Sequence, residues 1–337
     1  MVGEDAARQL WDMAEDAWAD LYFLIRSREI KCDHHGGLIH AWHRPHFEAE
    51  DRAYAASLKA WGLDDRLSFM DRAETAKFLG TDVYCGGMFD VGGGHLHPLK
   101  LVLGMARVAE TDGANLYETS AVMRFEQMSD GVRLYLDNGC TVICRKLLLC
   151  GNGLMEGLNR QVDAHVLPIH NFMLATTPLN DPTILPKGLA VSDSRFVVNY
   201  FRKTPDNRLI FGGGEGYGTG FPRDIAAIVR HNMLKIYPQL AGVEITHAWG
   251  GTLAVTLTRA PFVRRLSNDV LVSAGYSGQG VVLAPYFGKL MARAVTGDDS
   301  GVALLERLPV PPFHGGRWLR KPLLAAGLSY YALRDRI

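Results

Sequence analysis

The chain has 337 residues, of which 47% are hydrophobic and 21% charged, a composition typical of globular proteins. Lys and Arg together number 36, as do Asp and Glu, so no net charge attracts the chain to nucleic acid or to an anionic membrane surface. The sequence has no basic run interleaved with aromatic residues, and no apolar run approaches the roughly 18 residues of a membrane span. We therefore predict that neither nucleic acid nor membrane is a partner.

The N-terminal stretch "MVGEDAARQLWDMAEDAW" is acidic and amphipathic, which differs from a signal peptide. The five cysteines are odd in number and follow no disulfide-framework spacing: Cys32, Cys85, Cys140, Cys144 and Cys150. Cysteines without a disulfide framework usually behave as small buried apolar residues, as in proteins of a reducing compartment. We predict a cytoplasmic protein.

The first third of the chain predicts helices around a strand. Apolar residues at helical spacing predict one amphipathic helix over 5–29, and "DRAETAKFLG" predicts a short helix with Asp71 as N-cap and Gly80 as its end. Between them, "GGLIHAWH" alternates like a strand. It belongs to a histidine-rich patch that lacks a Cys or carboxylate at ligand spacing, so we predict no metal site.

The next segment predicts strands that lead to a glycine turn. Glycines 92–94 predict a turn, Pro98 a helix start, and "NLYETSAV" a strand. "GVRLYLDNGCTVICRKLLLCGNG" predicts three strands with a hairpin at Asn138-Gly139. "KLLLC" is apolar throughout, as in a central strand buried on both faces, and it runs into glycines whose backbone can approach a ligand closely.

The remainder predicts a sheet and then a second glycine turn. Residues 166–265 contain alternating strands, typical of a mostly antiparallel sheet, with one helix at 225–236 that Pro238 ends. We interpret "FGGGEGYGTG" as a mobile loop over the substrate. "VSAGYSGQGVVLAPYFGKLMARAV" predicts a strand, a glycine turn and a long helix, which is the layout of a cofactor cradle.

No glycine cluster has the G-x-G-x-x-G spacing of a dinucleotide-binding fold, and the first predicted element is a helix. We therefore expect the opening βαβ unit to be absent from this sequence, through a lost or misplaced start or because the product is a remnant.

Several ordered motifs nevertheless point to a family. "GGGHLHPLKLVLGMA", "VLPIHNFMLATTPL", "YFRKTPDNRLIFGGGEGYGTGFPRDI", "AWGGTLAVTLTRAPFV" and "SAGYSGQGV" together resemble the FAD-dependent oxidoreductases of the D-amino-acid oxidase superfamily, and the nearest branch is of the gamma-glutamylputrescine oxidoreductase type. The resemblance covers roughly residues 8 to 335. It implies an α/β fold in which an N-terminally truncated, Rossmann-like FAD-binding domain is interleaved with a mostly antiparallel substrate domain.

The change from buried apolar runs to alternating strands at about residue 166 predicts the domain limits. They are 1–30, 91–165 and 266–310 for FAD binding, 31–90 and 166–265 for the substrate, and 311–337 for a C-terminal helical tail.

By the same resemblance, the late glycine turn lies against the flavin ring, residues 150–153 lie near the pyrophosphate, Val122 lies near the adenine, and Trp249 with its glycines lies beside the ring. The implied cofactor-binding residues are Val122, Cys150, Gly151, Asn152, Gly153, Gly250, Gly251, Gly275, Tyr276, Ser277, Gly278, Gln279, Gly280 and Val281. Trp249 and His95 are candidate catalytic residues. The alternatives are an interdomain core aromatic for Trp249 and a helix-flanking histidine for His95.

Tyr200 and Arg202, two apart on one strand face, are candidates to anchor a substrate carboxylate; the alternative is an ordinary solvated strand face. Two functions follow. The first is an FAD-dependent oxidoreductase that moves hydride from an amine or amino-acid-like substrate to flavin N5. The second is an inactive relic or subunit that keeps the substrate domain but cannot hold FAD alone. We expect weak FAD binding by this form, and self-association or a partner chain.

Overall fold

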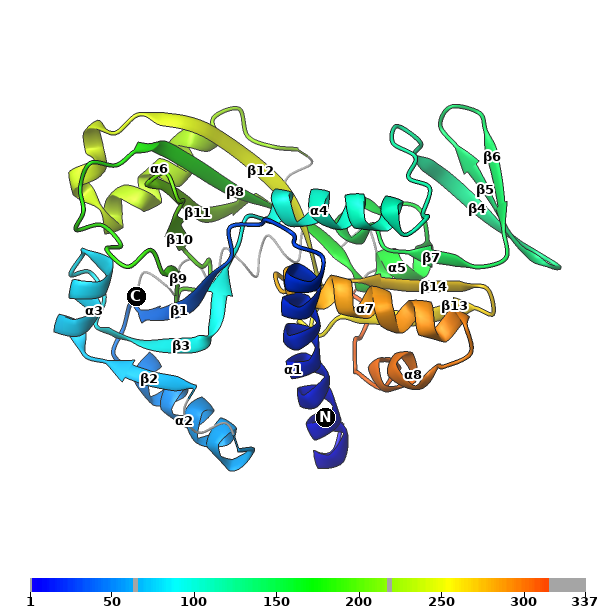
Figure 1. Cartoon of the computed structure of the whole chain (residues 1–337), viewed down its shortest axis with the longest axis horizontal. Helices are drawn as coiled ribbons and strands as arrows, with labels where there is room; N and C mark the ends of the chain where they lie inside the picture. Colours follow the sequence, from blue (N-terminus) through cyan, green and yellow to red (C-terminus); the bar gives the residue numbers. More distant parts are fainter. Residues whose placement is uncertain (1, 63–65, 217–219, 315–337) are drawn as a thin grey trace. The chain divides into compact units, whose positions relative to one another are not determined.

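The computed structural model describes residues 2–62, 66–216 and 220–314. The chain divides into two compact units, each built from separate stretches of sequence (Figure 1). Within the described residues, unit 1 comprises 2–31, 98–169 and 252–314, and unit 2 comprises 32–97 and 170–251 apart from the gaps named above. The fold is mixed α/β, as predicted.

The elements of unit 1 are α1 (Glu4–Ser27), α4 (Pro98–Thr111), β4 (Val122–Met128), β5 (Gly131–Leu136), β6 (Thr141–Cys144), β7 (Leu147–Leu149), η1 (Asn152–Leu154), α5 (Arg160–His165), β13 (Phe262–Ser267), β14 (Val270–Ala274), α7 (Gly280–Val295) and α8 (Ser300–Glu306). Those of unit 2 are β1 (His35–Trp42), α2 (Phe47–Ala60), β2 (Leu67–Met70), α3 (Arg72–Leu79), β3 (Gly86–His95), β9 (Ala190–Asp193), β10 (Tyr200–Lys203), β11 (Arg208–Gly216), α6 (Ile225–Ile236) and η2 (Pro238–Gly242). The unit boundary falls within β8 (Leu167–Pro178) and β12 (Ile245–Val255).

Unit 1 contains two three-stranded sheets, in the orders β13-β14-β7 and β4-β5-β6. All five residues of β14 are buried, and the strand runs directly into the turn that precedes α7. The apolar stripe of α7 packs over β14, and α1 lies beside α7 (Figure 1). Burial of β14 and of one face of α7 therefore fixes both ends of the glycine turn between them.

Unit 2 is built on an eight-stranded sheet in the order β12-β8-β11-β10-β9-β1-β3-β2. Antiparallel pairs join β1 to β3, β2 to β3, β9 to β10, β10 to β11 and β8 to β11, whereas β1 and β9 are parallel. The prediction of a mostly antiparallel sheet is confirmed. Residues directly opposite one another form the core row Ile39, Val191, Phe201, Phe211 and Leu174, which packs against α3 and α6.

Local signals in the sequence predicted several elements well. Helix α6 begins and ends at the predicted residues. Helix α3 has the predicted N-cap, since Asp71 accepts from the Glu74 N–H and Glu74 accepts from the Asp71 N–H, and Gly80 ends it at φ +74. The hairpin at Asn138-Gly139 joins β5 to β6.

Three predictions of local structure were wrong. "NLYETSAV" becomes a strand only at Val122, because most residues before it are exposed and Thr119 adopts φ +50. "KLLLC" contributes β7, which lies at the edge of its sheet as far as the described residues go, and β14 holds the central position. Glycines 92–94 lie within β3 instead of a turn, where Gly94 pairs with Gly36.

Two further predictions fall mainly outside the described residues. Of the helical tail at 311–337, only residues 311–314 are described, and these are not helical. Of the loop predicted over the substrate, residues 217–219 lie outside the described part of the chain, and its first residues belong to β11.

Gly80 offers a test of the packing of α3. A Cβ at Gly80 would lie 2.2 Å from the carbonyl oxygen of Thr183, which is backbone and cannot rotate away. Gly188, in the same unit, also has positive φ, but a Cβ there meets nothing within 4 Å. We expect Gly188→Ala to lower the free energy of unfolding by about 1 kcal/mol, and Gly80→Ala by about 3 kcal/mol. Denaturant titration followed by circular dichroism measures both; equal losses would contradict the packing argument.

Candidate functional site

The two glycine turns of unit 1 meet. The N–H of Gly275, immediately after β14, donates to Oδ1 of Asn152 at 3.0 Å. Two residues later, the N–H of Ser277 donates to the carbonyl of Ala254 at 3.0 Å. Segments 150–155, 252–256 and 274–280 therefore converge, although they are far apart in the sequence.

Glycine is required at two of these contacts. A Cβ at Gly153 would lie 3.0 Å from the carbonyl oxygen of Leu253, and a Cβ at Gly275 would lie 2.6 Å from the methyl carbon of Thr256. Gly275 also adopts φ +73, which an L side chain rarely tolerates. The glycines thus serve close packing of backbone in this cluster.

The side chains around the turn are neutral. Tyr276 is buried, and its hydroxyl lies 2.8 Å from Oγ of Ser273. Burial raises the pKa of Tyr276 to about 12, while the bond to Ser273 opposes this shift. Cys150 is exposed as a residue, but protein atoms surround its sulfur. They keep water away from the thiolate, which raises the pKa of the thiol. Both groups are therefore protonated at neutral pH.

With Tyr276 turned inward, the turn presents backbone to solvent. Gly278 and Gln279 are exposed, and α7 begins at Gly280 without a side-chain cap. Among the described residues, none accepts a hydrogen bond from the N–H of Gly278, Gly280 or Val281. Free N–H groups at the positive end of a helix dipole favour an anionic ligand group.

In unit 2, the sheet face opposite the core carries a polar row. Met88, His40, Ser192, Tyr200, Gly212 and Met173 are directly opposite one another on β3, β1, β9, β10, β11 and β8. The Tyr200 ring lies flat across Gly212, where a Cβ would be 2.2 Å from the ring carbons. Its hydroxyl donates to Oδ1 of Asn171. The absence of a side chain at Gly212 thus leaves room for the ring, and the bond to Asn171 anchors its hydroxyl.

The structure brings Arg202 and His95 together. Arg202 is two residues from Tyr200, but its guanidinium interacts with His95 and with the Asp33 carboxylate. Burial lowers the pKa of Arg202, and the negative charge of Asp33 opposes this shift. His95 lines a cavity of about 390 Å³ together with Asp33, His34, His35, Pro186, Gly188, Lys203, Thr204, Pro205 and Asn207.

The His95 imidazole is neutral. Burial lowers its pKa to about 4; a hydrogen bond to the Gly188 carbonyl opposes the shift, and the Arg202 charge adds to it. Because Nε2 lies 2.9 Å from that carbonyl, Nε2 carries the hydrogen. Nδ1 is buried and has no hydrogen-bond partner within the described residues.

The other predicted residues have separate surroundings. Trp249 is 41% exposed on β12, and Gly250 makes room for the Phe221 ring, which a Cβ would meet at 2.3 Å. At Gly251 a Cβ would meet nothing within 4 Å. Val122 begins β4 and pairs with Leu136, in a different sheet from β14.

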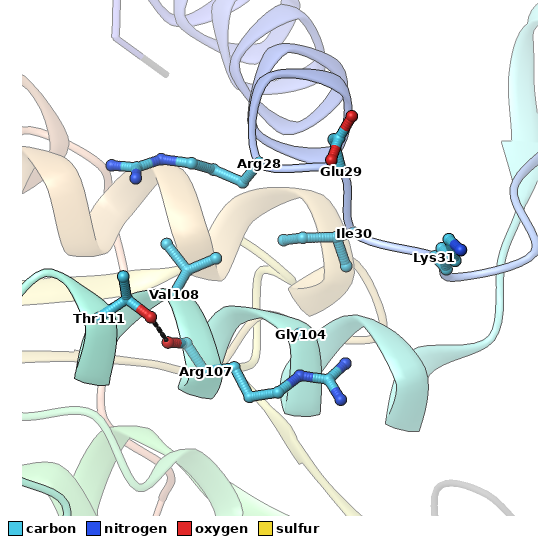
Figure 2. Close-up of a pocket in the computed structure, with 8 residues that line it drawn as sticks. All are labelled: Arg28, Glu29, Ile30, Lys31, Gly104, Arg107, Val108 and Thr111. Carbon is cyan, nitrogen blue, oxygen red and sulfur yellow. Dashed lines mark hydrogen bonds between the residues drawn. The ribbon is translucent and has the colours of Figure 1, made fainter.

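A further cavity of unit 1 contains none of the predicted site residues. It has a volume of about 400 Å³ and lies between the end of α1 and α4 (Figure 2). Ile30 packs against Gly104, where a Cβ would be 2.3 Å from its methyl carbon. Arg28, which also lines the cavity, forms a bidentate ion pair with Asp112. This arrangement is a structural contact between two helices.

Neither a metal site nor a membrane-spanning helix is found in the part of the chain that the structure describes. No group of three or more His, Cys, Asp or Glu side chains there could hold a metal ion. No described helix is both long and apolar enough to cross a membrane.

Known proteins match nearly the whole chain. A family model described as FAD dependent oxidoreductase matches residues 2–294. This chain belongs to that family. The "Probable oxidoreductase OrdL" of Rhizobium meliloti is 43% identical over 100% of this chain and 78% of its own length. The "Gamma-glutamylputrescine oxidoreductase" of Escherichia coli is 32% identical over 99% of this chain and 79% of its own.

Solved structures agree with the family in fold. The crystal structure of glycine oxidase from Geobacillus kaustophilus superposes with a TM-score of 0.73 at 18% identity, covering 94% of this chain and 83% of that one. The protein is accordingly an FAD-dependent oxidoreductase, as the sequence motifs implied.

The glycine cluster of unit 1 fits a flavin cofactor of this family. Its open backbone around Gly278, where a Cβ would meet nothing within 4 Å, leaves room for a planar ring, and its free N–H groups suit an electron-rich group. The family membership and this donor set point to the same cofactor, FAD.

Sequence reasoning missed part of the polar face in unit 2. It did not identify Asn171, Ser192 or Gly212, nor the contact of His40 with Asp51. The alternation in "GGLIHAWH" signals that His40 and Trp42 share a face, but strand order was needed to bring Ser192 and Tyr200 onto that face.

Gly278→Val should lower the FAD content of the purified protein. The substitution adds a branched side chain at φ +99 on the exposed turn, where it strains the backbone and covers the free N–H groups. The matched control is Gly297→Val, at φ +112, just past the end of α7, where a Cβ also meets nothing within 4 Å. The flavin-to-protein absorbance ratio measures both. Equal ratios would refute the assignment of the turn.

His95 should make stability depend on pH. Its folded pKa of about 4 lies below the value of roughly 6.5 expected for an unfolded chain. The unfolded chain therefore binds the proton first, and stability is lost progressively as the pH falls from about 6.5 to about 4. His95→Gln should flatten this decline in denaturant titrations, whereas His231→Gln, at an exposed position of α6, should leave it unchanged. A decline that persists in His95→Gln would contradict the neutral, buried imidazole.

Proposed function

We propose that this FAD-dependent oxidoreductase oxidises a small molecule that carries an amine, by removing hydride from the carbon bonded to nitrogen. The names of two relatives and neighbours, gamma-glutamylputrescine oxidoreductase and glycine oxidase, support an amine or amino-acid-like substrate. The observation that carries the proposal is the polar face of the unit 2 sheet, where the Tyr200 ring lies flat over Gly212.

In this proposal unit 1 binds the flavin and unit 2 binds the substrate. The turn from Gly275 to Val281, with Gly151, Asn152 and Gly153 packed beside it, would hold the FAD, which when bound supplies N5 as the hydride acceptor. The N–H groups of Gly278, Gly280 and Val281 would stabilise negative charge on a bound FAD. The chain needs no further nucleophile for this reaction.

Unit 2 offers complementary contacts for an amine. The Tyr200 ring is half-buried, and its π face would attract an ammonium group. Arg202 would bind a carboxylate of the substrate, and Ser192 leaves space beside the ring. His95 would act only as a hydrogen-bond acceptor through Nδ1, because its other nitrogen is bound to Gly188. Trp249, which is partly exposed, would contribute a second aromatic surface.

Gly212→Ala tests the role of the Tyr200 ring. The added Cβ must displace the ring, and a misplacement of about 1 Å can slow a reaction roughly 10²-fold. We expect kcat/KM with γ-glutamylputrescine to fall by about that factor at unchanged FAD content. The control is Gly36→Ala on β1, where a Cβ meets nothing within 4 Å.

The measurement is anaerobic bleaching of the flavin absorbance after mixing with the amine. Equal rates in Gly212→Ala and the wild type would exclude Tyr200 from the substrate site. If no amine reduces the flavin of the wild type, the inactive subunit becomes the better description of this chain.

A further inference from the structure

His40 lies on the same sheet face as Tyr200. It pairs with Ser192 of β9, which in turn pairs with Tyr200 of β10. Directly paired residues of neighbouring strands point to the same side of a sheet, and two strand spacings separate His40 from Tyr200 by about 10 Å. The small Ser192 lies between these two larger side chains, so the side chains of this row extend least from the sheet at Ser192.

A buried carboxylate orients the His40 imidazole. Nδ1 of His40 lies 2.8 Å from Oδ2 of Asp51, and Nε1 of Trp42 donates to the same oxygen at 2.6 Å. Asp51 lies on α2 and is 9% exposed, whereas the His40 side chain is 30% exposed. A carboxylate oxygen only accepts, so Nδ1 carries the hydrogen, and in the neutral form of this imidazole the lone pair is on Nε2. Asp51 therefore holds His40 in the tautomer of a base.

The charged groups around His40 are otherwise paired or distant along the row. On β3, Asp90 lies on this face but is bound to Arg66 at 2.8 Å. On β9 the neighbour is the neutral Ser192, and on β10 the Arg202 guanidinium interacts with Asp33. On α2, Arg52 is paired with Glu48 at 2.7 Å, and the Asp51 carboxylate is the group in hydrogen-bond contact with the His40 ring.

We infer that His40 is a further catalytic residue, which accepts a proton from the ammonium group of the substrate at Nε2. The inference rests on the proposed function. An ammonium nitrogen has no lone pair to assist loss of hydride from its carbon, so the amine must first become neutral. The N–H bond breaks, its electron pair stays on nitrogen, and the proton binds Nε2, where the Asp51 carboxylate stabilises the resulting imidazolium. The lone pair of the neutral amine can then assist loss of hydride from the adjacent carbon, for which bound FAD would be the acceptor.

The test compares His40→Gln and Asp51→Asn with the control His231→Gln, an exposed histidine on α6 of the same unit. The FAD-loaded chain is mixed anaerobically with γ-glutamylputrescine or putrescine over a range of pH. Calorimetric binding of the same amines gives a readout that does not depend on turnover. Circular dichroism and FAD content are recorded for each variant.

We expect the amine to reduce the flavin of the His40→Gln variant about 10²-fold more slowly than that of the wild type at neutral pH. The variant should also bind the amines roughly tenfold more weakly. Its rate should rise about tenfold per pH unit as free amine becomes available, whereas the wild-type rate levels off. Asp51→Asn should lose less in both measurements, because the amide oxygen still accepts from Nδ1. A residue that only supports the fold would lower FAD content or stability without changing the shape of the pH profile.

Unchanged binding and an unchanged pH profile in His40→Gln overturn the inference, and so do equal effects of His231→Gln. If His40→Gln does not fold, the pH profile of Asp51→Asn decides. A wild type that binds amines but is not reduced by them overturns the proposed oxidation alone, and weaker binding in His40→Gln then still supports amine recognition by His40. A wild type that binds no amine overturns both.

Discussion

The hydrogen bond from the Gly275 N–H to Asn152 Oδ1 holds together two turns that lie 123 residues apart in the chain. Asn152 itself adopts φ +49, and the late turn has positive φ at Gly275, Ser277 and Gly278. Backbone in these conformations has few favourable local contacts of its own, so it depends on partners elsewhere in the fold. The Asn152 bond, together with the bond from Ser277 to Ala254, supplies them and fixes the start of α7. The donor set of unit 1 therefore depends on the side-chain amide of Asn152.

In unit 2 a single strand register determines both stability and chemistry. The row Ile39, Val191, Phe201, Phe211 and Leu174 builds the core, and the row one residue further on each strand carries His40, Ser192, Tyr200 and Gly212 on the opposite face. A slip of one residue would exchange the two rows, burying His40 and Tyr200 in the core and exposing Phe201. The apolar row thus secures the position of the polar one, because any alternative register costs the burial of the core.

How much of this could be predicted depended on the range of the interactions. Helix α6 and the capping box of α3 follow from residues within four positions of one another, and the sequence predicted both. The apolar run "KLLLC" correctly indicated a strand, but its position at the sheet edge is set by β14, more than a hundred residues away.

The same limit applies to the candidate site. The late turn was predicted from its own glycines and from the resemblance, whereas the contacts of Asn152 with Gly275 and of His40 with Asp51 join different elements. The sequence placed His40 only in a histidine-rich patch without a predicted metal site, and the paired strands and α2 are what give it a neighbour and a direction.

The two units differ in where charge can change with pH. The side chains that flank the glycine turn, Tyr276, Cys150, Asn152 and Ser277, are uncharged at neutral pH, and burial keeps the first two protonated well into the alkaline range. The stabilisation that this turn offers an anionic group comes from backbone dipoles, which do not titrate. The polar face of unit 2 instead carries the His40 imidazole beside the Asp51 carboxylate. If the rate of flavin reduction depends on pH but FAD binding does not, the ionising group is therefore on the amine or on the polar face of unit 2.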